Sequence, residues 1–200
     1  MSTQVRTLTF TRTIRGQLIL ATGFALLTAL GALLQINIGP VPITLQVLFV
    51  LLSGLVLGSR LGALSQVEYL AIGFAGAPVF AGGNSGLIAL LGPTGGYLAG
   101  FVAGAYLAGL VAESAGRPGR VRFFLAGLLG TAAIYISGMV WLSTWFAIGH
   151  GTNWLAELSS AWQFGVLPFI GVDVVKAVVA SGVTLSGRAL TRQIVDLTGK

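Results

Sequence analysis

An aspartate and a lysine lie three residues apart in a segment that otherwise has the composition of a membrane-spanning helix. They are Asp173 and Lys176, and the apolar segment runs from Gln163 to Gly187. A charged side chain at the bilayer centre costs about 2.5–3.5 kcal/mol on insertion scales, so such residues usually carry function. Residues three apart share one helix face and can pair. The pair therefore predicts either a ligand-binding site or an ion pair that locks helix packing.

The composition is that of an integral membrane protein. Of the 200 residues, 55% are hydrophobic and only 8% are charged, whereas a soluble domain has about 25% charged residues. We expect one transmembrane domain spanning residues 1–200, with a basic cytoplasmic head at 1–16, a helix bundle at 17–187 and a cytoplasmic tail at 188–200. The absence of cysteine excludes disulfides, thiol catalysis and thiolate metal sites.

Six apolar segments predict an all-α, polytopic membrane protein with six transmembrane helices. The head resembles the charged region of a signal peptide, but the apolar run behind it is too long, so we interpret it as a retained first helix. The segments are Gln17–Ile38, Ile43–Gly58, Leu61–Val79, Gly92–Ala112, Arg122–Ile148 and Gln163–Gly187.

The positive charges predict the orientation in the membrane. Of the 11 Lys and Arg residues, all except Lys176 lie in the head, the second connection, the fourth connection or the tail. These four regions share one side of a six-helix bundle, so the positive-inside rule places both termini in the cytoplasm. The basic excess is thus a topology signal, and we expect membrane lipid and no nucleic acid as a partner. The predicted location is the bacterial plasma membrane, as a multi-pass protein.

Small residues recur at four-residue spacing in two predicted helices. Ala21, Ala25 and Ala29 could serve either internal packing or docking to another membrane subunit. The ladder of Gly96, Gly100 and Gly104 with Ala108 belongs to a central helix, and we predict that it serves internal packing.

Polar residues gather near the predicted outer mouth of the bundle. The third connection, from Phe80 to Leu91, is glycine-rich and contains Asn84, which is either a turn residue or a ligand contact. Thr44 and Gln46 lie near the outer end of the second helix and can face the same mouth. These groups suit a small anion with an amide-like head: Lys176 for a carboxylate, Asp173 for N–H groups, and Asn84 and Gln46 for a carbonyl. Tyr69 and Phe80 could pack against an apolar ring.

No catalytic constellation is visible, so we do not expect an enzyme. His150 has no companions with metal-ligand spacing, and no carboxylate pair has workable spacing for acid–base chemistry. Glu68 lies within the third segment, either as a protonatable group or as a structural residue near Arg60. We expect no cofactor and no metal.

Several motifs resemble the BioY family, the biotin-specific substrate-binding subunits of energy-coupling-factor (ECF) vitamin transporters. The similarity covers almost the whole chain, and its motifs are GPVPITLQ at 39–46, YLAIGFAGAPVF at 69–80, GPTGGYLAGF at 92–101, and Asp173 with Lys176. The resemblance implies six transmembrane helices, an outward-facing pocket and biotin as the ligand. It implies that Asn84, Asp173 and Lys176 contact the vitamin. It also implies a transmembrane coupling subunit and two ATPase subunits as partners, with Ala21, Ala25 and Ala29 as the docking motif.

Two other functions remain compatible with the residues alone. A stand-alone secondary transporter of a small organic anion would use Glu68 or Asp173 as a proton carrier. A structural membrane subunit would use Asp173 and Lys176 only as a packing lock.

Overall fold

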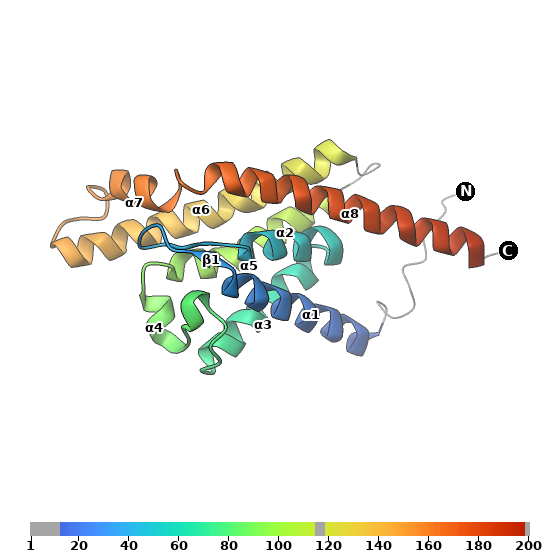
Figure 1. Cartoon of the computed structure of the whole chain (residues 1–200), viewed down its shortest axis with the longest axis horizontal. Helices are drawn as coiled ribbons and strands as arrows, with labels where there is room; N and C mark the ends of the chain where they lie inside the picture. Colours follow the sequence, from blue (N-terminus) through green and yellow to red (C-terminus); the bar gives the residue numbers. More distant parts are fainter. Residues whose placement is uncertain (1–12, 115–118, 199–200) are drawn as a thin grey trace.

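The computed structural model describes residues 13–114 and 119–198, and for residues 190–198 it describes the backbone only. The predictions that rest on Arg6, Arg12, Arg117 and Lys200 lie outside these residues. The elements in chain order are α1 (Ile14–Leu33), β1 (Gln35–Ile36), β2 (Ile43–Thr44), α2 (Gln46–Leu57), α3 (Ser59–Phe74), the 3₁₀ helix η2 (Ala81–Gly83), α4 (Gly86–Leu91), α5 (Gly95–Glu113), α6 (Arg120–His150), α7 (Leu158–Gly165) and α8 (Ile170–Thr198) (Figure 1).

Within residues 13–114 and 119–198, four helices are long and apolar enough to cross a membrane. They are α1, α5, α6 and the part of α8 from Ile170 to Ala189. Helix α2 is apolar but has only 12 residues, and α3 has 16 residues, fewer than the roughly 20 residues of a full span. The mostly helical fold agrees with the prediction from composition.

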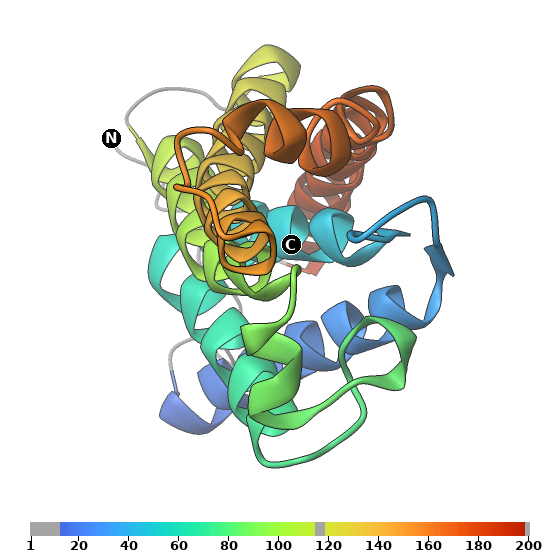
Figure 2. The ribbon, with the colours of Figure 1, turned by 90° about the vertical axis from the view of Figure 1, so that its left-hand side faces the viewer.

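Helices α5, α6 and α8 run roughly along the longest axis of the molecule, and α5 packs closely against α6 (Figures 1 and 2). Helix α1 crosses this direction at an angle and packs against α2 and α3. The glycine ladder of α5 makes its close approach to α6 possible. A Cβ at Gly96 would lie 2.2 Å from the Cβ of Trp141, and one at Gly104 would lie 2.7 Å from Ile134. Only glycine fits such close backbone contacts. The prediction that this ladder serves internal packing is confirmed.

The first helix ends five residues before the predicted end at Ile38. Residues 35–36 leave the helix and pair with residues 43–44 in a small antiparallel ladder, in which Gln35 lies opposite Thr44. The backbone N–H of Leu45 also bonds to the carbonyl of Gly31 at 3.1 Å. This hairpin fixes Thr44 and Gln46 where α2 begins, next to the end of α1.

The predicted last helix, Gln163–Gly187, is two helices. The chain leaves α7 at Gly165 and begins α8 at Ile170. Pro168 explains the break, because proline cannot donate a helix hydrogen bond and disfavours helix in the residue before it. The Tyr97 hydroxyl bonds the carbonyl of Gly165 at 2.8 Å. Helix α8 also does not stop at Gly187 but continues to Thr198 through most of the predicted tail.

Candidate functional site

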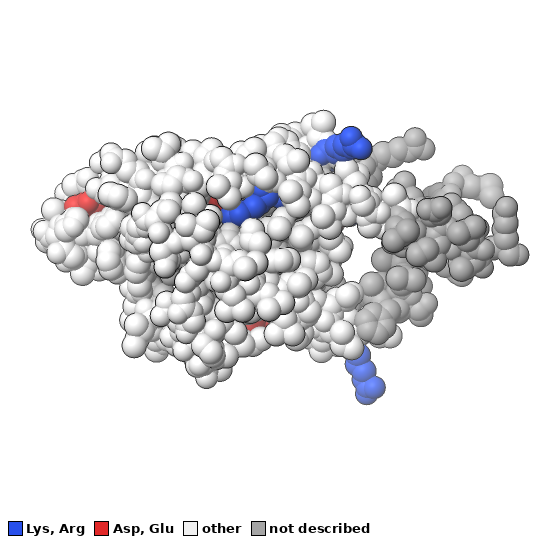
Figure 3. All heavy atoms as spheres, viewed as in Figure 1, with Lys and Arg blue, Asp and Glu red and all other residues white. Residues whose placement is uncertain are grey.

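Asp173 and Lys176 form a buried ion pair on α8. The lysine Nζ lies 2.5 Å from Oδ1 of the aspartate, and the two residues are only 2% and 5% exposed. Because α8 begins at Ile170, Asp173 lies in its first turn, where the helix dipole stabilises a negative charge. Figure 3 shows basic and acidic atoms side by side in the middle of one face, surrounded by uncharged surface.

Asp173 has a second partner on a different helix. The Tyr135 hydroxyl of α6 donates a hydrogen bond to Asp173 Oδ2 at 2.7 Å. Each carboxylate oxygen therefore has its own partner, Lys176 for Oδ1 and Tyr135 for Oδ2. A buried carboxylate whose two oxygens each bond a different partner is held in one orientation.

A second polar group lies where β2 meets α2. The Thr44 hydroxyl donates to Gln46 Oε1 at 2.9 Å and accepts from the Gln46 backbone N–H at 3.2 Å. The Gln46 amide nitrogen donates to the Tyr69 hydroxyl of α3 at 2.6 Å, which donates to the Val79 carbonyl at 3.0 Å. This chain of hydrogen bonds ties the start of α2 to the third connection.

The third connection is anchored by Phe80. Its ring is 2% exposed and fills the space above Gly73 of α3, where an added Cβ would lie 2.1 Å from the ring. The ring also meets Tyr69 edge to face, with centroids 5.5 Å apart. The buried Phe80 ring therefore holds the first residue of the third connection against α3.

These two polar groups line a common cavity. Its volume is about 50 Å³, well below the roughly 300–1,000 Å³ of pockets that hold drug-sized ligands. Aromatic side chains also contribute to the lining. The lining comes from the β1–β2 hairpin, α2, the third connection, α5 and α8, and includes Thr44, Gln46, Phe80, Thr94, Tyr97, Phe101, Phe169, Asp173 and Lys176.

The structure brings most of the predicted binding residues to this cavity, but not all of them. Thr44, Gln46, Phe80, Asp173 and Lys176 line it. Tyr69 lies behind the lining and contacts it through Gln46 and Phe80. Asn84 is exposed, and its side-chain amide donates a hydrogen bond to the Ala81 carbonyl of its own turn at 2.7 Å. In this structure Asn84 therefore stabilises the turn and does not line the cavity.

The alanine ladder of α1 does not present a docking surface here. Ala21 is 0% exposed and Ala25 is 1% exposed, and Ala29 is partly buried against the same core. On the same helix face, Thr28 bonds Gln66 of α3 at 3.4 Å. Docking to another subunit needs accessible small residues. The burial of these alanines therefore agrees with the alternative that the ladder serves packing within the bundle.

Glu68 and His150 also acquire specific partners. Glu68 accepts a hydrogen bond from Thr22 of α1 at 2.9 Å and does not line the cavity. His150 is the last residue of α6, and its Nδ1 lies 2.9 Å from Glu157 Oε1. Hydrogen bonds from His150 and then Thr152 hold the pKa of Glu157 below its ordinary value. His150 is nevertheless largely exposed, with 58% of its side chain accessible to solvent.

Several residues of the site were not predicted. Tyr97, Phe101 and Phe169 line the cavity, and Tyr135 holds Asp173. Tyr97 and Phe101 lie in the motif at 92–101, which gave no role to single residues. Tyr135 had no signal, because a tyrosine in an apolar helix is common and its partner lies 38 residues away.

Comparison with known proteins decides the family. The profile of the BioY family matches residues 1–193. The chain belongs to the BioY family. This family membership and the long apolar helices make it a multi-pass protein of the cell membrane.

Two relatives of this BioY-family chain have names that state a transport role. A protein of Pyrococcus horikoshii named probable biotin transporter BioY is 45% identical over 157 residues, covering 78% of this chain and 86% of the relative. The biotin transporter BioY of Thermotoga maritima is 39% identical over 169 residues, covering 84% of this chain and 94% of the relative.

A solved structure has the same fold. It is the crystal structure at 2.1 Å of the S-component for biotin from an ECF-type ABC transporter. The match has a TM-score of 0.72 at 27% sequence identity and covers 86% of this chain and 90% of the other. The similarity therefore extends over most of both chains.

Proposed function

We propose that this chain is the biotin-binding subunit of a vitamin uptake transporter, which captures biotin from outside and delivers it inward. The observation that carries the proposal is the Asp173–Lys176 pair, buried against a cavity that also contains the Gln46 amide. The names of the relatives and of the solved S-component support biotin as the ligand.

The chemistry of the cavity matches the groups of biotin. Asp173 can accept further hydrogen bonds from ureido N–H groups, because each carboxylate oxygen has more than one lone pair. Lys176 can donate to a carbonyl or carboxylate oxygen of the ligand. Gln46 retains an amide N–H beyond its bond to Tyr69. Phe101 and Phe169 offer apolar surface to the fused rings.

Binding requires the cavity to enlarge. A space of about 50 Å³ is too small for a ligand of the size of biotin. The third connection is the element best suited to move, because it covers the cavity with Phe80 and α4 packs only lightly on α5 and α3. We propose that this connection opens to admit biotin and closes to exclude water from the charged pair.

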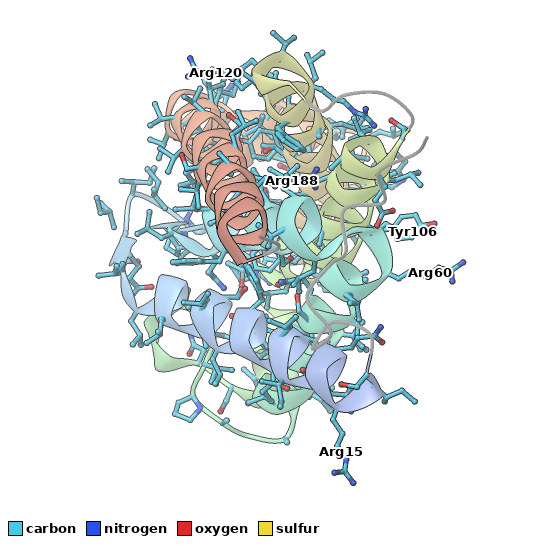
Figure 4. All side chains as sticks on the ribbon, turned by 90° about the vertical axis from the view of Figure 1, so that its right-hand side faces the viewer. Arg15, Arg60, Tyr106, Arg120 and Arg188 are labelled. Carbon is cyan, nitrogen blue, oxygen red and sulfur yellow. The ribbon has the colours of Figure 1, made fainter. Side chains whose placement is uncertain are left out.

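The proposal includes six membrane crossings with both termini in the cytoplasm. Arg15, Arg60, Arg120 and Arg188 support it, because they gather toward one end of the bundle (Figure 4), as the positive-inside rule requires. It also includes a transmembrane coupling subunit and two ATPase subunits as partners. The sequence has no Walker-type nucleotide motif, so uptake against a gradient must draw on such partners.

Titration of biotin into the purified protein tests the proposed function. Removing one partner of a buried ion pair costs about 3–5 kcal/mol, because the other charge stays buried. We therefore expect the Lys176→Ala variant to bind biotin at least 100-fold more weakly than the wild type, a factor that corresponds to about 2.7 kcal/mol. Arg60→Ala removes an exposed cation far from the cavity and serves as the control. Equal affinities of Lys176→Ala and the control would contradict the assignment.

A further inference from the structure

Tyr135 is placed to act on ligand binding without lining the cavity. It lies on α6, is partly buried against the core cluster, and donates to Asp173 Oδ2 at 2.7 Å. It is absent from the residues that line the cavity, whereas Asp173 is among them. Any influence of Tyr135 on the ligand therefore passes through Asp173.

The aspartate needs such a second anchor. The terminal torsion of an aspartate is broad and about two-fold, so one bond to Lys176 leaves the plane of the carboxylate undetermined. Lys176 lies on the same helix as Asp173, and its ammonium can donate hydrogen bonds to either carboxylate oxygen or to both. Without Tyr135, the carboxylate could turn to place both oxygens on the ammonium and withdraw its lone pairs from the cavity.

The bond from α6 prevents this rotation. With Oδ1 held by Lys176 at 2.5 Å and Oδ2 held by Tyr135 at 2.7 Å, the carboxylate plane is fixed by two helices. An ionised carboxylate has about four lone-pair sites, so both oxygens can still accept bonds from a ligand. Tyr135 and Lys176 thus leave the remaining sites available for N–H groups of the ligand.

We propose that Tyr135 is a positioning residue for ligand binding, whose hydroxyl orients Asp173 toward the N–H donors of the ligand. The inference deepens the proposed function and rests on it. It concerns the hydroxyl donor alone, because the tyrosine ring also packs in the core and a phenylalanine would keep that packing.

The test compares biotin affinity in four proteins: the wild type, Tyr135→Phe, Tyr106→Phe, and a protein with 4-aminophenylalanine in place of Tyr135. Loss of a hydrogen bond to a charged group is expected to weaken biotin binding on the order of 10- to 100-fold in Tyr135→Phe. 4-Aminophenylalanine keeps an N–H donor at the ring end and should restore most of that affinity. Tyr106 is 42% exposed on α5, and Tyr106→Phe should bind biotin as the wild type does.

Each outcome bears on the inference. Wild-type affinity in Tyr135→Phe would overturn it. A 4-aminophenylalanine protein that binds as weakly as Tyr135→Phe would also overturn it, because the donor would then not be the operative group. Failure of the wild type to bind biotin would be a separate result, which overturns the proposed function and this inference with it.

Discussion

At the residue scale, the site is held by a few polar side chains whose partners come from distant parts of the chain. Asp173 and Lys176 could be predicted from sequence, because charge inside an apolar segment is costly and therefore conspicuous. Their spacing of three residues on one helix also predicted that they pair, and the distance of 2.5 Å between Lys176 Nζ and Asp173 Oδ1 confirms this pairing. Tyr135 could not be predicted, because its role depends on how α6 packs against α8.

The contact of His150 and Thr152 with Glu157, outside the cavity, leads to a prediction about how stability depends on pH. Hydrogen bonds from His150 and Thr152 lower the pKa of Glu157, so the folded state favours the ionised carboxylate. The resulting stability is present above the ordinary pKa of 4.5 and is lost as pH falls through the lowered pKa. Glu157→Gln should therefore lower the melting temperature near neutral pH, and the difference from the wild type should disappear in strongly acidic buffer.

Thermal unfolding in detergent at several pH values checks this prediction. In a His150→Ala background the effect of Glu157→Gln should be smaller, because the main partner is already missing. A difference in melting temperature that stays constant down to acidic pH would contradict the assignment to the ionised carboxylate.

At the scale of elements, sequence predicted the apolar segments well and their ends less well. The predicted segments Gly92–Ala112 and Arg122–Ile148 correspond to α5 and α6 within three residues at each end. Helix α3 ends at Phe74 and not at Val79, and α8 continues past Gly187 to Thr198. Two further errors lie at β1 and at the α7–α8 break. A two-residue strand is too short to leave a periodic pattern, and hydropathy alone does not show that Pro168 interrupts a continuous apolar run. Both errors lie next to the cavity, which the irregular segments help to build.

The anchoring of the third connection can be tested at Gly73. An added Cβ would lie 2.1 Å from the Phe80 ring, so Gly73→Ala should displace this ring from its place over α3. Overpacking of this kind costs about 1–3 kcal/mol, and we expect both a lower melting temperature and weaker biotin binding.

Gly23→Ala is the matched control, because an added Cβ there meets no atom within 4 Å and the position lies in helix α1. Titration of biotin and thermal unfolding of both variants give the comparison. If Gly73→Ala bound biotin as tightly as Gly23→Ala, Phe80 would not be an essential part of the closed cavity.

At the scale of the whole molecule, α5 and α8 are both long enough to cross a membrane and both contribute to the lining of the cavity. The cavity is built by four stretches that lie far apart in the chain, from the β1–β2 hairpin to the start of α8. Composition predicted an integral membrane protein, and the match to the BioY family, over residues 1–193, agrees with this prediction. The direction in which the α1 alanine ladder faces could not be predicted, because its spacing suits internal packing and docking equally.

The central claim is that the cavity beside Asp173 and Lys176 binds biotin. The most direct measurement is to purify the wild type and an Asp173→Ala, Lys176→Ala double variant from cells supplied with biotin, denature both, and identify the released small molecules by mass spectrometry. The proposal predicts that biotin is released by the wild type and not by the folded double variant. Equal release of biotin from both proteins would show that Asp173 and Lys176 do not form the binding site. If the wild type released no biotin and also did not bind added biotin, the central claim would be contradicted.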